Sequence, residues 1–447
     1  MKNLKIFIIY NACISGDVHY LPNSLRVLDW CGYPFQSFPP NFRPKQLGVL
    51  NMPRSRIKQL GEGLKHLTKL TSLNFEGSQF LIEIPDLSSS PNLRYLNANG
   101  CTSLVEVHPS VGYLDKLLVL DFSYCCELTK FPNKVRLKSL NFFGLYGCIK
   151  LESFPEIVDK MESLNELNLE RSAIKDLPAS IGHLIGLESL NLRGSAIKEL
   201  PSFVGNLTVL NTLFLDGSAI EELPSSIGNL TAVTTLTLEG CENLANLPQS
   251  IYGLQNIRHI TLGQCPKLVT LPLNAESLPL EVRTNANNPH DDGWVMYFEE
   301  CNVSNFDSLE NFCWWSMLIR INLSKSNFVS LPVCISKCVN LLYLDLTGCK
   351  RLVEILVQLP VSILEIYMAD CISLERFSTL SKILEDGDMQ DISYMDLSNC
   401  HRLGLDVSKM AKIVLNNEVT YLSFFYIINM HTLHILLILY YVRCTHD

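Results

Sequence analysis

The sequence predicts an α/β repeat fold, a curved horseshoe-shaped solenoid with a parallel β-sheet on its concave face and short helical or irregular segments on its convex face. Three successive segments, LNELNLERSAIKDLP (164–178), LESLNLRGSAIKELP (187–201) and LNTLFLDGSAIEELP (210–224), match one another with a period of 23 residues. Their leucines alternate with polar residues, which is the pattern of a strand with one buried face. A unit of this size cannot bury its own leucines, so each unit must stack on its neighbours.

Each unit also contains a turn and a return path. In the unit 187–201, Ile197 and Leu200 bring the chain inward on the far side of the core, and Pro201 closes the unit. The next segment, 202–207, is expected to carry the return path as a short helical turn.

The same frame extends over most of the chain. A period of 23 residues lies within the range of about 20–29 that is typical of leucine-rich repeats, and about sixteen units fit the frame when a partial unit at Met1 is included. Outside the three segments above, strands are predicted to begin at Leu25, Leu47, Leu70, Leu93, Leu117, Leu140, Val233, Ile257, Leu318, Leu341, Ile363 and Ile392.

The 16 cysteines do not indicate a disulfide framework. Eight of them share one repeat position, and serine occupies that position in other units, so the position requires a small, buried, weakly hydrogen-bonding side chain. We therefore expect reduced, structural thiols. The cysteines are Cys101, Cys125, Cys148, Cys241, Cys265, Cys349, Cys371 and Cys400, and the serines are Ser78, Ser172, Ser195, Ser218 and Ser326.

Two stretches depart from the frame and define the expected domain organisation. The first is rich in turn-forming and acidic residues, and the second is an apolar tail. The expected regions are leucine-rich repeats over 1–272, an insertion with a degenerate repeat over 273–317, leucine-rich repeats over 318–415, and an atypical apolar tail over 416–447.

The two ends raise the question of membrane targeting. The apolar run near Met1 has five residues before Asn11, which is short for a signal peptide. Residues 419–442 contain no charged side chain and could span a bilayer, although Asn429 and His431 would be costly there. We expect an atypical end to the chain, with a membrane span as the alternative.

Composition and motifs exclude several classes of function. The net charge of −9 does not provide the basic surface that nucleic acid requires. No phosphate-binding loop or HExxH motif occurs, and Cys334 and Cys338 have no second pair to complete a zinc site. We therefore expect neither an enzyme nor a bound cofactor or metal.

The outward side chains of the strands remain as the candidate site, because the core does not need them. Glu170, Arg193, Asp216 and Glu239 share one position on successive units and are expected to form a ladder of alternating charge. The ladder is either purely structural or, with Phe214 beside it, part of a recognition surface. The candidate protein-binding residues of the concave face are Glu170, Arg193, Phe214, Asp216, Glu239, His259, Arg320, Tyr343 and Tyr367.

Several motifs resemble one family. The segments YLPNSLRVLDWCGYP (20–34), NLRYL (92–96) and DLSNCH (396–401), with the repeated GSAIxxLP units, are similar to the leucine-rich-repeat region of plant TIR-NB-LRR intracellular immune receptors. The resemblance covers about residues 1–415. Because Met1 falls inside a strand of the frame and the similarity ends near Asn417, we expect a fragment of such a receptor or a truncated gene model.

The resemblance implies a function in plant defence. Such domains sense pathogen effectors, or host targets that effectors have modified, and contribute to defence signalling. The implied location is the cytoplasm or nucleus, and the implied partners are a protein ligand and, in a full-length receptor, TIR and nucleotide-binding domains. The alternative is a membrane-anchored extracellular leucine-rich-repeat receptor, although such repeats usually read LxGxIP and these units lack that glycine.

Overall fold

The computed structural model describes residues 3–10, 18–61, 63, 66–268, 294–300, 317–377, 392 and 394–403. The chain divides into two compact units, residues 1–236 with 253–256 and residues 237–252 with 257–447. In each unit short strands pair in parallel with the strand of the neighbouring repeat. The predicted leucine-rich-repeat solenoid with a parallel sheet is therefore confirmed.

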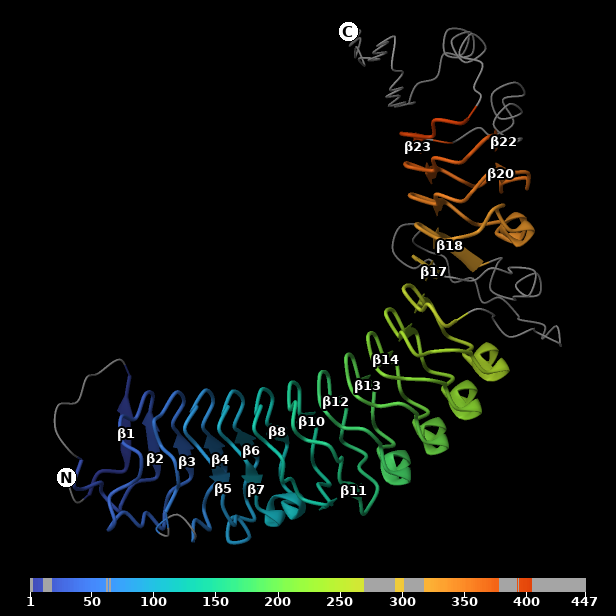
Figure 1. Cartoon of the computed structure of the whole chain (residues 1–447). Helices are drawn as coiled ribbons and strands as arrows, with labels where there is room; N and C mark the ends of the chain where they lie inside the picture. The colour runs from blue at the N-terminus through green and yellow to red at the C-terminus, as the bar shows by residue number, and fades with distance from the viewer. Residues whose placement is uncertain are drawn as a thin grey trace, which may run out of the picture. The chain divides into compact units, whose positions relative to one another are not determined.

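The first unit is a stack of strands in chain order (Figure 1). Each strand pairs in parallel with the next one, and the return segments lie on the side away from these strands. The strands are β1 (Ile6–Ile9), β2 (Val27–Trp30), β3 (Val49–Asn51), β4 (Ser72–Asn74), β6 (Tyr95–Asn97), β8 (Val119–Asp121), β10 (Phe142–Gly144), β12 (Glu166–Asn168), β13 (Ser189–Asn191) and β14 (Thr212–Phe214).

The leucines of successive strands are in register. Leu167 lies opposite Leu190, and Leu190 lies opposite Leu213. All three side chains have no exposed surface, because the alternation of a strand directs every second residue toward the core. The expected row of stacked leucines is confirmed for these three positions. Leu236, the fourth, is the central residue of β15 (Thr235–Thr237), which lies at the boundary between the two units.

Within the described residues, the second unit has six further strands of the same kind. They are β16 (His259–Thr261), β17 (Trp294–Tyr297), β18 (Leu318–Asn322), β19 (Tyr343–Asp345), β21 (Glu365–Tyr367) and β23 (Tyr394–Asp396). Strand β17 pairs with both β16 and β18, with a register shift between Trp294 and Val295. The repeat frame predicted no strand start at this position, which lies within the range 273–317.

The return segments are short, as predicted. Some of them form 3-10 helices, which are η2 (Pro109–Tyr113), η3 (Ala179–His183), η4 (Ser202–Asn206), η5 (Ser225–Asn229), η6 (Gln249–Gly253) and η9 (Val333–Lys337). Others form pairs of two-residue strands, which are β5 (Glu83–Ile84) with β7 (Glu106–Val107), β9 (Lys134–Val135) with β11 (Glu156–Ile157), and β20 (Glu354–Ile355) with β22 (Arg376–Phe377). Pro201 precedes η4 with φ −64°, which is the value that its ring imposes. Gly205 allows successive helices to approach closely, because a Cβ atom there would lie 2.7 Å from the carbonyl oxygen of Ser226.

In many repeats the shared Cys/Ser position supports the backbone of the turn after the strand, although the buried hydroxyls of Ser172 and Ser195 make no such bond. The thiol of Cys101 donates to the carbonyl of Phe75 at 3.2 Å, and the thiol of Cys125 donates to the carbonyl of Ala98 at 3.2 Å. The hydroxyl of Ser78 makes the equivalent bond to Met52 at 3.0 Å. Burial raises the pKa of the Cys101 thiol to about 12, so this sulfur stays protonated and remains a donor. Cys101 and Cys125 are both unpaired as thiols and buried, as expected.

Within the described part of the chain, no helix has the length and apolar character needed to cross a membrane. The apolar run 419–442 and the whole of the expected tail 416–447 lie outside the described residues.

Truncating a stacked leucine should destabilise the first unit strongly. We expect Leu190→Ala to lower the free energy of unfolding by about 2–5 kcal/mol, because the fully buried site cannot refill. The measurement is chemical denaturation followed by circular dichroism. Thr212→Ala, at an outward position of the next strand, is the control and should change stability by less than about 0.5 kcal/mol. Equal effects of the two substitutions would contradict the assigned strand faces.

The buried thiols should resist alkylation in the folded protein. With iodoacetamide at about pH 8, we expect no labelling of Cys101, Cys125 or Cys148, since each is buried and holds its proton. The partly exposed Cys31 and Cys126 should be labelled and serve as internal controls. Peptide mapping by mass spectrometry, with and without denaturant, provides the readout. A disulfide at any of the three buried positions would contradict the assignment of structural thiols.

Candidate functional site

The candidate site is the strand face, which we define as the outward side chains of the main-sheet strands together with the turn residue that follows each strand. In β13, Ser189 and Asn191 flank the buried Leu190 and belong to this face. The turn residue comes two positions after the strand, so Arg193 is the turn residue of β13. Each repeat therefore contributes three side chains to the surface.

The last outward residue of many strands holds the following turn. The side-chain oxygen of Asn168 accepts from the backbone N–H of Glu170 at 3.1 Å, and that of Asn191 accepts from the N–H of Arg193 at 3.2 Å. This Asx turn lets the chain leave the strand without an unpaired N–H group. These side chains do not fill the leucine core, but they are not free to vary, because the turn uses their acceptor oxygen. The same bond is made by Asn74, Asn97, Asp121, Asn322, Asp345 and Asp396.

In the first unit the predicted charge ladder forms one ion pair. Arg193 Nε lies 2.7 Å from Asp216 Oδ2, and the guanidinium carbon of Arg193 lies 3.9 Å from the centroid of the Phe214 ring. Glu170 instead accepts from Asn191 Nδ2 at 3.0 Å and lies 3.9 Å from Arg171 Nε. The alternation of charge stops at Asp216, because Glu239, the exposed turn residue after β15, has the same sign.

Arg193, Phe214 and Asp216 thus form one partly exposed cluster. The side chains of Arg193 and Asp216 are 38% and 24% exposed, so their ion pair is screened by water and contributes little to stability. A guanidinium over an aromatic ring remains available to a partner on its outer side. In place of a continuous ladder, the structure therefore has this three-residue cluster.

The second unit brings the other candidates together with two residues that were not predicted. The rings of His259 and Tyr297 are 5.6 Å apart, and those of Tyr367 and Tyr394 are 5.0 Å apart. The guanidinium of Arg320 lies 4.4 Å from the ring centroid of Tyr343. The hydroxyl of Tyr367 donates to Glu365, and this bond together with burial raises the pKa of Tyr367 to about 12.

The sequence contained a signal for one of the two missed residues. Tyr394 in ISYMDL occupies the same place as the predicted Tyr343 in LLYLDL. Tyr297 lies in the stretch assigned to an insertion, where the leucine spacing is absent, so only the pairing of β17 with β16 places it beside His259.

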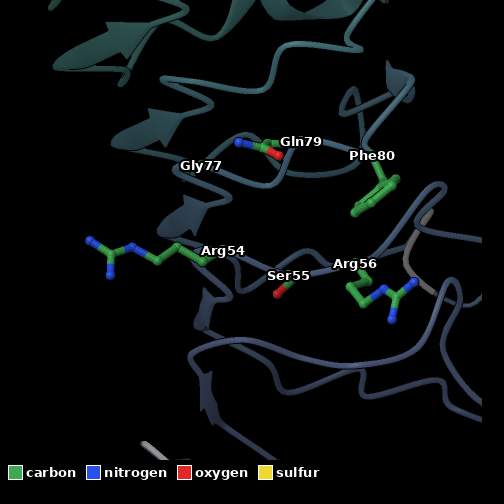
Figure 2. A pocket seen from close by; sticks show the side chains of 6 residues that line it. All are labelled: Arg54, Ser55, Arg56, Gly77, Gln79 and Phe80. Carbon is green, nitrogen blue, oxygen red and sulfur yellow. The ribbon is translucent and has the colours of Figure 1, made fainter.

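A hollow on the first unit lies between the turns after β3 and β4 (Figure 2). It has a volume of about 360 Å³ and is lined by Arg54, Ser55, Arg56, Gly77, Gln79 and Phe80. Arg56 stacks on Phe80 at 5.6 Å, whereas Arg54 extends away from them. The Ser55 hydroxyl donates to the carbonyl of Met52 at 2.8 Å, so it serves the turn and is not positioned as a nucleophile.

The described ranges contain no group of three or more histidine, cysteine or acidic side chains that could hold a metal ion. The chemistry of the strand face consists of guanidinium, aromatic and carboxylate groups in contact with one another. Such groups suit the recognition of another protein, because Arg and Tyr are enriched among the residues that dominate binding energy.

Comparisons with known proteins identify a family. The family model described as "Disease resistance protein RPS4B-like, leucine-rich repeats" matches residues 136–210 and 209–396, which is more than half of the chain. The chain is 35% identical over 181 residues to the TMV resistance protein N of Nicotiana glutinosa, a match that covers 40% of this chain and 16% of that protein. It is 36% identical over 191 residues to the disease resistance protein RML1A of Arabidopsis thaliana, covering 41% and 19% respectively.

The matched region therefore spans less than a fifth of the length of these curated relatives. Among solved structures, a leucine-rich-repeat protein of Leptospira interrogans, LIC12759, aligns with a TM-score of 0.44 and 17% identity, over 81% of this chain and 93% of that chain. The expected resemblance to plant disease resistance proteins is confirmed by the family match.

Removing an Asx-turn side chain should destabilise the first unit. Asn191 is almost fully buried, and Asn191→Ala removes its bonds to Glu170 and to the N–H of Arg193. We expect a loss of about 1–3 kcal/mol in the free energy of unfolding, measured by urea denaturation. Ser189→Ala, on the same strand, should change it by less than about 0.5 kcal/mol. If both variants unfold at the wild-type midpoint, the Asx turns have no structural role.

Proposed function

Since this chain belongs to the leucine-rich-repeat family of RPS4B-like disease resistance proteins, we propose that its strand face is the surface of a plant immune receptor that recognises pathogen effectors, or host proteins that effectors have modified. Recognition would contribute to defence signalling. The chain would act by binding and would carry out no catalytic step.

One observation carries this proposal. Both units present a partly exposed arginine stacked on an aromatic ring of the strand face, Arg193 on Phe214 at 3.9 Å and Arg320 on Tyr343 at 4.4 Å. Neither contact fills the leucine core. Exposed arginine and aromatic side chains on a rigid sheet lose little conformational entropy when a partner binds, which favours their use as anchors.

The proposed setting follows from the relatives. The matched region is a small part of each curated relative, so we propose that this chain works beside TIR and nucleotide-binding domains of a longer receptor. We propose the cytoplasm or nucleus as its location, in keeping with an intracellular receptor. The membrane-anchored alternative is not favoured by the family match.

The test compares two variants of the full chain. The double variant Arg193→Gln with Phe214→Ala removes the cluster of the first unit without introducing an acidic charge beside Asp216. The control is Lys175→Gln, which breaks the exposed ion pair of Lys175 with Glu152 outside the strand face. Binding to a panel of purified effectors from one adapted pathogen, and to their host targets, is measured by biolayer interferometry.

We expect at least one effector or modified host protein to bind the wild-type chain. The double variant should weaken this binding about tenfold or more, since anchor residues commonly contribute over 1 kcal/mol each, while its melting temperature stays within about 3 °C of wild type. Lys175→Gln should bind as the wild type does. Equal loss in both variants, or a panel that includes the cognate pathogen but yields no ligand, would contradict the proposal.

A further inference from the structure

The strand face of β19, β21 and β23 has a regular arrangement of tyrosines and carboxylates. Each strand contributes one of each, and their order reverses from one strand to the next. In all four cross-strand pairs a tyrosine lies opposite a carboxylate. The pairs are Tyr343 with Glu365, Asp345 with Tyr367, Glu365 with Tyr394, and Tyr367 with Asp396. We refer to these six residues as the tyrosine–acid grid.

The grid is accessible and its carboxylates are held in place. All six side chains are partly exposed. One oxygen of Asp345 accepts the N–H of Thr347 at 2.9 Å, and one oxygen of Asp396 accepts the N–H of Ser398 at 2.9 Å. Glu365 accepts the hydroxyl of Tyr367. These bonds orient three negative charges on one small surface without supplying a cation.

The fold does not require the negative charge of Asp345 and Asp396. Asparagine makes the same Asx turn at Asn168, Asn191 and Asn322. A neutral side chain is therefore sufficient for the structure at this repeat position. Asp345, Glu365 and Asp396 lie on three successive strands, so their charges add to one negative surface that a ligand of opposite charge would complement.

The chain itself shows which cation suits this surface. Arg320 lies on β18, in register with Tyr343, and its guanidinium is stacked over the Tyr343 ring at 4.4 Å. Tyr367 and Tyr394 form a second aromatic platform, with ring centroids 5.0 Å apart, next to Glu365 and Asp396. Tyr343 shows that an arginine can stack on a tyrosine ring of this surface. The Tyr367–Tyr394 platform offers a similar aromatic face with carboxylates beside it.

From this geometry we infer that the tyrosine–acid grid binds an arginine-containing, positively charged segment of a partner protein. A planar guanidinium can stack on a tyrosine ring and at the same time donate two parallel hydrogen bonds to a neighbouring carboxylate. A lysine ammonium cannot do both, because it is a point charge without a flat face. The inference rests on the proposed function only in taking the ligand to be a protein.

The experiment uses the full chain and three synthetic octapeptides, (Arg-Gly)4, (Lys-Gly)4 and the uncharged (citrulline-Gly)4, with isothermal titration calorimetry at low and physiological salt. The test variant is Asp345→Asn with Glu365→Gln and Asp396→Asn, which keeps every hydrogen-bond acceptor named above. The matched control is Asp121→Asn, because Asp121 makes the same Asx turn in the first unit. Tyr394→Leu tests the aromatic platform separately.

We expect the wild-type chain to bind the arginine peptide several-fold more tightly than the lysine peptide and to bind the citrulline peptide weakly. The triple variant should lose about tenfold or more in affinity for the arginine peptide, Tyr394→Leu should lose its preference for arginine over lysine, and Asp121→Asn should bind as the wild type does. The melting temperature of each variant is measured alongside, so that a loss of binding is not a loss of folding.

Three results would overturn the inference: equal binding of the citrulline peptide, unchanged binding by the triple variant, or an equal loss in Asp121→Asn. Effector binding that depends on Arg193 and Phe214 but persists in the triple variant, with no peptide binding, would refute the grid and leave the proposed function intact. Peptide binding that the triple variant abolishes, in a chain that recognises no effector, would support the grid and contradict the proposed function.

Discussion

In-register parallel pairing between successive repeats is the constraint on which the rest of this structure depends. Leu167, Leu190 and Leu213 lie opposite one another because the backbone bonds of each strand are completed only by its neighbours. A strand of three residues has too little surface to be stable alone, so its stability comes from the strands on either side. Every other feature, including the turns, the thiols and the strand face, is repeated because this contact is repeated.

The hydrogen bonds that the turns need restrict which residues can occupy part of the strand face. The N–H groups after each strand require acceptors, and the last outward residue provides one, as Asn191 does for Arg193. At the same end of the strand, a thiol or hydroxyl such as that of Cys125 or Ser78 satisfies a buried carbonyl. Of the three side chains that each repeat presents, one is therefore committed to the turn in many units. The first outward position and the turn residue are not committed in this way. The last outward position also belongs to the recognition surface where it holds an aromatic residue such as Phe214 or Tyr367, which cannot make an Asx turn.

The strand faces of the two units differ in composition. In the first unit Arg193 satisfies its charge with Asp216 and its flat face with Phe214, which gives a compact and nearly neutral cluster. In the second unit tyrosines and carboxylates alternate, and Arg320 is stacked on Tyr343 at the edge of the grid. The electrostatic character of the two surfaces therefore differs.

The sequence alone determined the repeat, the buried face of each strand and the identity of the Cys/Ser position, because these follow from contacts that every unit makes in the same way. It also identified Arg193, Phe214, Arg320 and Tyr343 as candidates on the strand face, where the structure stacks each arginine on an aromatic ring. Their role in binding a partner stays a prediction. Only the tertiary structure decided which side chains meet. Arg193 turns to Asp216 and Glu170 to Asn191, and β17 brings Tyr297 beside His259. The physical reason is that cross-strand partners lie a whole repeat, or an irregular stretch, apart in the sequence. In addition, a long side chain can turn toward the strand on either side, and the neighbours on both sides determine which direction it takes.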